Sequence, residues 1–260
     1  MARSRRRPGT SAPLADRAIV AGGGRAERVE ALLAGESLDT SRISYDFAAE
    51  HVALIAAGSG ADRRIDESLA STSLPHLVVR SGGGAVWAWI GSLDGFNASA
   101  LEDLACEAAA ASHATGEACL TIGEPAHGLG GWRLTHHQAR AALAVAQCGN
   151  EPVVRYRDVA MLASVVRDDL LATSLHRLYL EPLEGGRDDG EELRETLRAY
   201  FAADRNVSEA GAAIGVTRQA VARRLRLAEE KLGRPLGACG AELETALRFE
   251  ALEATPLSGG

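Results

Sequence analysis

Apolar residues follow two different spacings along the chain, and the change from one to the other falls near residue 160. Before this point, short apolar runs of strand length alternate with segments in which apolar residues recur every three or four positions. The runs are typical of buried strands, and the recurrence is typical of helices that bury one face. After residue 160 only the helical spacing remains. The pattern therefore predicts a mixed α/β region followed by an all-α region.

The first region contains strand and helix signals in regular alternation. Strands are predicted over 51–60, in the two arms of a β-hairpin within 76–92, over 118–125 and over 153–156. Helices are predicted over 14–35, 62–71, 98–113 and 135–147. The hairpin turn is marked by Gly82, Gly83 and Gly84, and the last helix by Thr135 as its N-cap. The order is βαββαβ, extended by one further helix and strand, so the predicted fold class is an α+β domain with a mixed sheet.

The second region is predicted to be helical throughout. One long amphipathic helix over 161–183 ends at a polar, glycine-rich stretch that we interpret as a linker. Further helices are predicted over 191–203, 208–214, 217–232 and 241–253. The predicted domain limits are 1–25 for a disordered basic tail, 26–160 for the α/β domain, 161–190 for a connecting helix and linker, and 191–254 for the second domain.

Residues 208–232 have the pattern of a helix-turn-helix. Ser208 is a suitable N-cap for a short helix rich in alanine, and Glu209 suits the positive end of its dipole. Gly215 can adopt the positive φ that ends this helix, and Thr217 can cap the next one. We therefore expect a short helix, a tight turn and a longer helix that runs to about Leu232.

The longer helix has two distinct faces at 100° per residue. Its apolar face consists of Val221, Leu225, Ala228 and Leu232. The opposite face and the N-terminal end are polar and basic, with no acidic residue between 215 and 228, which is what insertion into a phosphate-lined groove requires. The predicted DNA-binding residues are Thr217, Arg218, Gln219, Arg223, Arg224 and Arg226. The alternative is a helical hairpin whose arginines only solvate its surface.

The net charge of the chain restricts how it can bind nucleic acid. The formal net charge is −7 and the pI about 5.6, although 28 residues are Lys or Arg. A protein with this balance is not expected to coat nucleic acids generally, so DNA binding has to be local to one basic surface. Nearly all of the basic residues are arginine, and Lys231 is the single lysine.

The C-terminal part resembles the helix-turn-helix of the PucR/CdaR-like transcriptional regulators. The residues that carry the resemblance are Leu193, Thr196, Leu197, Tyr200, Asn206, Ser208, Val216, Arg218, Arg224, Leu225, Gly233 and Leu236. Four positions depart from the family pattern, where Thr217 replaces His, Gln219 replaces Asn, Ala220 replaces Thr and Arg223 replaces Tyr. These positions lie on or beside the predicted reading surface. The resemblance implies a sequence-specific DNA-binding regulator, and the four departures leave open which DNA sequence it reads.

The preceding block, from about residue 43 to 159, resembles the degenerate GGDEF-like domain found before this helix-turn-helix in the same family. Genuine GGDEF domains are diguanylate cyclases, so a nucleotide-binding or cyclase-related enzyme is the alternative function. Phosphoryl chemistry on GTP needs carboxylates that hold metal ions. The hairpin turn has glycines but no acid, and Asp62 lies beyond the end of the preceding strand. We therefore expect no enzyme activity, no catalytic residues and no cofactor.

Other candidate sites lack the partners that their chemistry needs. His136 and His137 have no cysteine or paired carboxylate at ligand spacing, so no metal site is expected. The glycines of 128–131 lack the lysine and hydroxyl of a phosphate loop and are expected to form a tight turn before Trp132. Trp87 and Trp89 alternate on one predicted strand, which places both on one face, in the core or at an interface.

Location and assembly can also be predicted from the sequence. The four cysteines are scattered, and the arginine-rich start has no apolar segment behind it. The apolar runs are shorter than the roughly 18 residues of a membrane span. These features predict a cytoplasmic protein away from membranes. One helix-turn-helix reads few base pairs, so we expect a homodimer or higher homo-oligomer on double-stranded DNA. The expected contacts are the Trp87 and Trp89 face and the helix over 161–183. An effector or sensory partner of unknown identity is left open.

Overall fold

The structure is a computed structural model that describes residues 23–70, 72–112, 118–149, 151–184 and 189–254. Most of the predicted tail over 1–25 and of the linker over 184–190 therefore lies outside the described residues. The chain divides into two compact units. The α/β unit contains the described residues up to Arg140 together with Pro152–Arg155, and the helical unit contains Ala141–Glu151 and the residues from Tyr156 onward.

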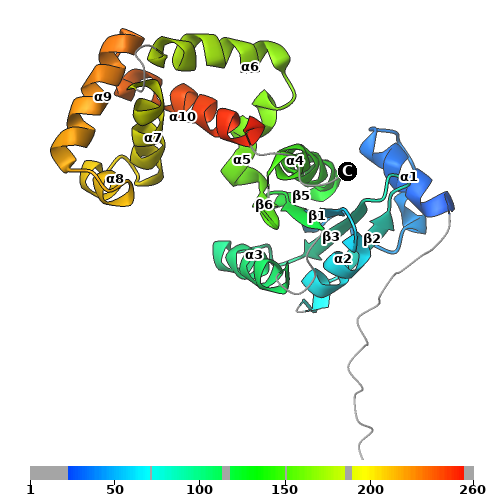
Figure 1. Cartoon of the computed structure of the whole chain (residues 1–260). Coiled ribbons are helices and arrows are strands. Elements are labelled where there is room, and N and C mark those ends of the chain that lie inside the picture. The colour runs from blue at the N-terminus through cyan, green and yellow to red at the C-terminus, as the bar shows by residue number, and fades with distance from the viewer. Residues whose placement is uncertain (1–22, 71, 113–117, 150, 185–188, 255–260) are drawn as a thin grey trace, which may run out of the picture. The chain divides into compact units, whose positions relative to one another are not determined.

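The α/β unit is built on a mixed sheet with the strand order β2-β3-β1-β4-β6 (Figure 1). Its strands are β1 (Glu50–Ala57), β2 (His76–Arg80), β3 (Val86–Ser92), β4 (Cys119–Ile122), β5 (Ala126–His127) and β6 (Val153–Arg155). The central strand β1 is antiparallel to β3, β4 and the short β5, and only β4 and β6 are parallel. The predicted order of elements and the hairpin are confirmed, and β5 is an addition that the sequence did not predict.

Helices cover both faces of this sheet (Figure 1). They are α1 (Gly23–Leu33), the 3₁₀ turn η1 (Thr40–Arg42), α2 (Ala61–Ala70), α3 (Ala98–Ser112) and α4 (Gly128–Cys148). On one face α2 and α3 bury aliphatic side chains against the sheet, including Leu54, Ile65 and Leu101. On the other face α4 supplies Trp132, His136 and Ala139, all of them buried.

The start of α4 corrects the predicted N-cap at Thr135. The helix begins seven residues earlier, at Gly128, and Thr135 lies inside it with its side chain fully buried. Its hydroxyl accepts a hydrogen bond from the backbone N–H of Ala53 at 2.9 Å and so supplies a partner for a buried strand amide. The glycines of 128–131 form the first turn of this helix. Position 131 requires glycine, because a Cβ there would lie only 2.4 Å from the backbone of Ala126.

Aromatic rings fill the space between α4 and β3. Trp89 stacks on Trp132 with 4.6 Å between the ring centroids and on His136 with 5.2 Å. Trp87 meets the edge of His136 at 4.7 Å, and the indole N–H of Trp89 donates to the backbone carbonyl of Trp132 at 3.1 Å. Both tryptophans of β3 thus lie on one face, as predicted. Trp89 is completely buried, so it belongs to the core and is not available for an oligomer contact. Trp87 is partly exposed, and its expected role at an interface stays a prediction.

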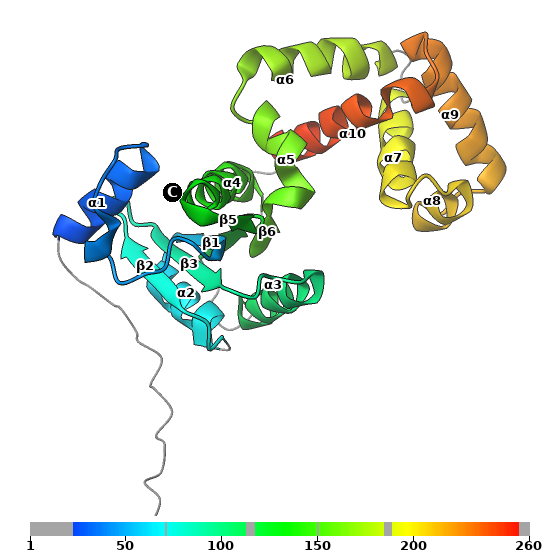
Figure 2. The same cartoon turned by 180° about the vertical axis from the view of Figure 1, so that it is seen from behind.

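Besides the C-terminal part of α4, the described residues of the helical unit form six α-helices and two short segments (Figure 2). They are α5 (Tyr156–Val165), α6 (Asp169–Leu175), the π-helical segment η2 (His176–Leu180), the 3₁₀ segment η3 (Glu181–Leu183), α7 (Asp189–Ala202), α8 (Val207–Ala213), α9 (Arg218–Leu232) and α10 (Leu236–Glu253). One aliphatic core joins them, and it includes Leu175, Leu183, Leu197, Leu225 and Leu243. Helix α10 begins five residues before the predicted start, with a kink at Cys239, where φ is −140°.

The prediction of a single helix over 161–183 is wrong. The chain leaves helical conformation at Asp168, where φ is −134°, and the Asp168 carboxylate caps α6 by accepting the backbone N–H of Leu171 at 3.0 Å. The same residues nevertheless pack on the helix-turn-helix core through Val165, Leu175 and Tyr179. The segment predicted as a connection is therefore part of the helical unit, while the predicted domain limits stay predictions.

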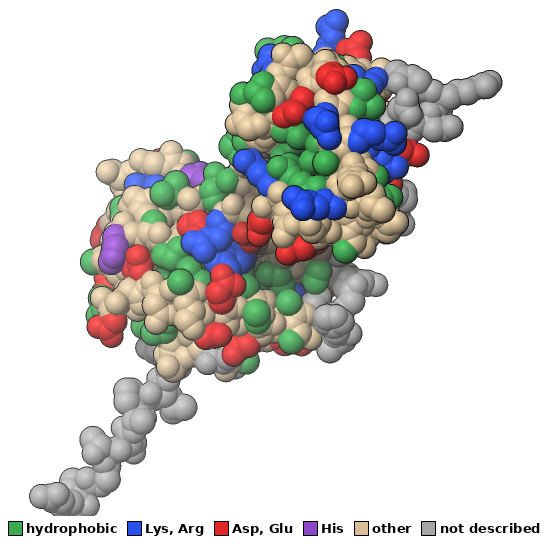
Figure 3. Space-filling view, turned by 90° about the vertical axis from the view of Figure 1, so that its left-hand side faces the viewer, with side chains coloured by type: hydrophobic (Ala, Val, Ile, Leu, Met, Phe, Trp, Pro, Cys, Tyr) green, Lys and Arg blue, Asp and Glu red, His purple; other side chains and the backbone are tan. Residues whose placement is uncertain are grey.

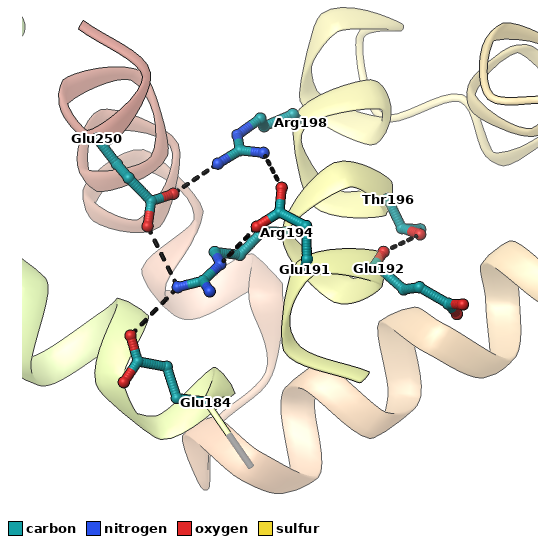
Figure 4. Close-up of polar contacts among 7 residues, drawn as sticks. All are labelled: Glu184, Glu191, Glu192, Arg194, Thr196, Arg198 and Glu250. Atoms are coloured by element: carbon teal, nitrogen blue, oxygen red, sulfur yellow. Dashed lines mark hydrogen bonds and ion pairs between the residues drawn. The ribbon is translucent and has the colours of Figure 1, made fainter. Parts of the chain in front are cut away.

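Ion pairs tie three parts of the helical unit together (Figure 4). Arg194 on α7 contacts Glu184, which follows η3, at 3.3 Å and Glu250 on α10 at 3.2 Å. Arg198 pairs with the same Glu250 at 2.6 Å and with Glu191 at 3.0 Å. The hydrogen bond from Arg198 lowers the pKa of Glu191, which keeps this carboxylate charged. These contacts hold α7 against α10 and the end of η3.

Candidate nucleic-acid interface

The first helix of the predicted motif, α8, starts earlier than the sequence suggested. Its N-cap is Asn206, whose side-chain oxygen accepts the backbone N–H groups of Ser208 at 3.0 Å and Glu209 at 3.3 Å. The amide of Asn206 in turn donates to the carboxylate of Glu209 at 2.8 Å. This reciprocal arrangement satisfies two free amides at the helix end. The predicted cap at Ser208 is therefore wrong by two residues, because asparagine competes well for the same role.

Two glycines make the turn between α8 and α9 possible. Gly215 adopts φ +69°, as predicted for the residue that ends the first helix. Gly211 was not singled out from the sequence. A Cβ at this position would lie 2.8 Å from the carbonyl oxygen of Val216, whose N–H donates to the carbonyl of Gly211 at 2.9 Å. The end of the turn thus packs directly against α8, and only glycine leaves room for this contact.

Helix α9 has the predicted limits and the predicted inner face. Thr217 caps it by accepting the backbone N–H of Ala220 at 3.2 Å, and Gly233 ends it with φ +66°. Val221, Leu225 and Ala228 are buried in the aliphatic core of the helical unit. The orientation of α9 about its own axis therefore follows from its apolar residues, and the opposite face is directed to solvent.

Five of the six predicted DNA-binding residues are exposed. They are Thr217, Arg218, Gln219, Arg223 and Arg226. Among the described residues, no ion pair involves Arg218 or Arg223, and the only hydrogen bond found for Arg226 runs to the carbonyl of Ala222, one turn earlier. Basic side chains gather on the face of the helical unit that Figure 3 shows. These guanidinium groups keep their donors available for a ligand.

Arg224 has a different position from the other five. Its guanidinium donates to the carboxylate of Glu192 at 2.6 Å and to the hydroxyl of Thr196 at 3.2 Å, and only 16% of its side chain is exposed. Thr196 is completely buried and donates to the carbonyl of Glu192 at 2.7 Å (Figure 4). The structure thus places Arg224 against α7. Sequence reasoning missed Glu192 and Thr196, because the partner of a helix cannot be read from the spacing of that helix alone.

A groove of about 420 Å³ runs along the side of α9 that faces the start of α7. Its lining residues are Glu192, Leu193, Arg223, Arg224, Arg226, Leu227 and Glu230. Of the two glutamates, Glu192 belongs to α7 and Glu230 to the C-terminal end of α9. The arginines before Ala228 and the acids after it therefore divide α9 into a basic N-terminal part and an acidic C-terminal part. A polyanion is attracted to the N-terminal part only.

In the α/β unit, the positions that a cyclase or metal site would need carry other residues or make other contacts. The turn between β2 and β3 contains glycine and serine but no acid, and Asp62 pairs with Arg80 at 2.5 Å. His136 is buried, and burial lowers its pKa to about 3, so the ring is uncharged at neutral pH. In the described ranges, no three His, Cys, Asp or Glu side chains come together in a way that could hold a metal ion. The absence of cyclase activity stays a prediction.

None of the described helices is both long enough and apolar enough to cross a bilayer. The longest, α4, is 21 residues but carries arginine and histidine side chains along its length.

Comparison with known proteins gives two matches to protein-family models. Residues 38–145 match the GGDEF-like domain, and residues 193–249 match the PucR C-terminal helix-turn-helix domain. Among solved structures, the chain is similar to the crystal structure of a regulator of polyketide synthase expression from Bifidobacterium adolescentis, with 17% identity and a TM-score of 0.40. That alignment covers 91% of this chain and 96% of the other, and at this TM-score it carries no structural argument. The comparison with curated proteins gives no match.

Proposed function

We propose that this chain binds a specific double-stranded DNA sequence through the exposed face of α9. The chain carries both domains of the PucR/CdaR-like transcriptional regulators and belongs to that family. In this proposal α9 enters the major groove with its N-terminal part. Gln219, Arg223 and Arg226 are the side chains that reach base edges, while Thr217 and Arg218 contact the phosphates beside the groove.

The observation that carries the proposal is the separation of two classes of arginine in the helical unit. Arg194, Arg198 and Arg224 are held by carboxylates of neighbouring helices. Within the part of the chain that the structure describes, the arginines of the outer face of α9 have no such partners, and no acid lies among them. Phosphates and the acceptor atoms of guanine are the ligands that these free donors fit.

Arg224 has a positioning role in this proposal. Its contacts with Glu192 and Thr196 hold α9 at a defined angle to α7. The prediction that Arg224 contacts DNA is replaced here by the proposal that it orients the helix whose other residues do so. Loss of Arg224 would then weaken the binding of every DNA sequence together, whereas loss of a base-reading residue changes the preference at one position.

A complementary part of the proposal concerns the number of copies and the α/β unit. One helix-turn-helix contacts too few base pairs to select a site in a genome, so two copies are needed to read two half-sites. The α/β unit then serves regulation, since its match is to a GGDEF-like domain and its glycine turn has no acid for metal.

The decisive experiment selects DNA with the purified full-length chain from a random duplex library and then measures affinity for the enriched sequence at constant salt. Arg223→Ala should weaken binding to that sequence at least tenfold, because a base-reading contact is worth about 1–3 kcal/mol. Binding to a scrambled duplex should change much less. The matched control is Arg28→Ala, an exposed arginine on α1 of the α/β unit, which should leave both affinities unchanged.

Two outcomes would contradict the proposal. A selection that enriches no sequence would leave only general attraction to polyanions. Equal effects of Arg223→Ala and Arg28→Ala on the affinity for the enriched sequence would show that the outer face of α9 does not read bases.

A further inference from the structure

A pocket of about 390 Å³ lies in the helical unit, between α10 and the segment formed by α6 and η2. Both views of the chain show α10 beside α6 (Figures 1 and 2). The volume falls in the range of sites for small organic molecules, roughly 300–1,000 Å³. One wall is the π-helical segment η2, whose first and last residues, His176 and Leu180, both line the pocket. Because π-helical turns are rare and occur frequently at functional sites, the wall and the volume together indicate a binding site.

The inner lining of this pocket is apolar. Leu175, Leu180 and Ala246 line it and are almost completely buried in the aliphatic core of the unit. Phe249 and Ala172 also line it, and both are partly exposed where they pack against the same core. A molecule in this pocket would therefore cover a hydrocarbon or aromatic body with these side chains.

The charged residues that line the pocket are acids. They are Asp169, Glu250 and Glu253, and the described lining contains no lysine or arginine. Arg194 and Arg198 already pair with Glu250. Asp169 and Glu253, in contrast, are exposed, and neither forms an ion pair with another described residue. These two free carboxylates attract a cation and repel an anion, so the charge and the lining together fit a cation with an apolar body.

Glu250 connects the pocket to the element that orients the recognition helix. Its carboxylate accepts hydrogen bonds from Arg194 at 3.2 Å and from Arg198 at 2.6 Å, both on α7 (Figure 4). Helix α7 also carries the two residues that hold Arg224 of α9. A cation beside Glu250 would compete with the two arginines for one carboxylate and weaken the contact of α7 with α10.

We propose that this pocket binds a small amine with an apolar body, and that the bound amine lowers the affinity of the chain for DNA by competing for Glu250. The ammonium group is attracted by Asp169 and Glu253, and the apolar body lies against Phe249 and Leu175. Binding of the amine is independent of DNA. Its effect on DNA rests on the proposed function, because α9 is the element that α7 orients.

Ligand-observed NMR titration of the full-length chain without DNA tests the site. The probes are phenethylamine, phenethyl alcohol and phenylpropanoate, which share one phenyl group and linker and differ in the charge of the end group. Phenethylamine should bind with a dissociation constant of roughly millimolar order, as expected for so small a molecule. Phenethyl alcohol should bind at least tenfold more weakly, and phenylpropanoate should show no binding, because the carboxylates of the pocket repel it.

Substitution of the two free carboxylates tests the same point from the side of the protein. Asp169→Asn combined with Glu253→Gln should weaken the binding of phenethylamine at least tenfold, because the charge that attracts the ammonium group is lost. Both residues are exposed, so the fold should be preserved. The matched control is Glu195→Gln, which removes an exposed acid of α7 that does not line the pocket, and it should bind phenethylamine like wild type.

The effect on DNA is measured with the enriched duplex at constant ionic strength, with and without saturating phenethylamine. The amine should lower the DNA affinity of the wild-type chain at least threefold. The same concentration should leave the affinity of the Asp169→Asn and Glu253→Gln double variant unchanged. Phenethyl alcohol should have no effect on either chain.

The site is overturned if phenethylamine does not bind, if phenethyl alcohol or phenylpropanoate binds equally well, or if the double variant binds the amine like wild type. The role of Glu250 is overturned if the saturated wild-type chain keeps its affinity for DNA. The titrations of the site contain no DNA, so their failure is distinguishable from failure of the DNA-binding proposal, which the Arg223→Ala comparison tests without any amine.

Discussion

In the α/β unit, Trp89, Trp132 and His136 stack in a closed interior where burial keeps the histidine uncharged. In the helical unit, Arg194 and Arg198 form ion pairs with carboxylates from three segments. In the first unit a buried titratable ring is thus held in neutral form between other rings. The second keeps full charges at the edges of an aliphatic core, and on α9 it leaves some of them without partners.

This difference predicts that the two units respond to different solution conditions. An uncharged buried histidine makes the α/β unit sensitive to acid, because the unfolded chain binds a proton that the folded unit excludes. Partly exposed ion pairs make the helical unit sensitive to salt, because mobile ions screen them. All three tryptophans of the chain lie in the α/β unit, so tryptophan fluorescence follows that unit alone.

The largest expected effect is the loss of the central ring in the α/β unit. Trp89→Ala should lower the free energy of unfolding of that unit by about 3–5 kcal/mol, because it leaves a large cavity beside Trp132 and His136. Denaturant titration followed by the fluorescence of Trp87 and Trp132 measures the change. The control is Trp87→Ala, since Trp87 is partly exposed and its loss should cost less. Equal effects of the two substitutions would contradict the central role of Trp89.

The next effect concerns pH and the neutral state of His136. The pKa of His136 falls to about 3 in the folded unit, through burial first and then through the charges of His137 and Arg140. The contribution of the neutral His136 to the free energy of unfolding should therefore be fully present above pH 6.5 and decline as the pH falls from 6.5 towards 3. At pH 5 the loss from this group is about 2 kcal/mol.

His136→Phe keeps a stacked ring that cannot take up a proton, so it should remove this part of the acid sensitivity. The measurement is the free energy of unfolding at pH 7 and pH 5, followed by tryptophan fluorescence. Burial also lowers the pKa of His51, so some acid sensitivity should remain in the variant. A pH dependence identical to that of wild type would show that His136 does not contribute.

The smallest of these effects is expected for the ion pairs of the helical unit. Arg194→Met should destabilise the unit by about 1–2 kcal/mol at low salt, because it removes the contacts of α7 with Glu184 and Glu250. The difference from wild type should shrink in concentrated salt. Hydrogen exchange of the α7 amides in the full-length chain measures both effects. Arg177→Met is the control, because that side chain is 74% exposed. A difference that does not depend on salt would contradict the screening argument.

Features set by local chemistry could be predicted from the sequence. Gly215 and Thr217 act within four residues of themselves, through a positive φ and a backbone hydrogen bond, and both were predicted correctly. The apolar face of α9 was correct for the same reason, because its spacing determines which residues are buried. The hairpin and the order of elements in the α/β unit also follow from local runs and glycines.

Features that depend on distant partners could not be predicted in this way. Thr135 looked like a cap, but its hydroxyl is used by Ala53, 82 positions away in the chain. The helical spacing of α9 placed Arg224 among the outward arginines, but in the structure its guanidinium donates to Glu192 and Thr196 of α7. The break in the helix over 161–183 is a different case. Asp168 was a local signal, and the apolar spacing that continues on both sides of it outweighed that signal in our interpretation.

The contact at Gly211 has a consequence for how this regulator can change. The angle between α8 and α9 depends on Asn206, Gly211, Gly215 and the buried residues of α9, none of which lies on the outer face. The outward positions 219, 223 and 226 support no part of that frame. Substitutions there should therefore leave the fold undisturbed. If α9 reads bases as proposed, single mutations at these three positions would change the preferred DNA sequence without a loss of stability.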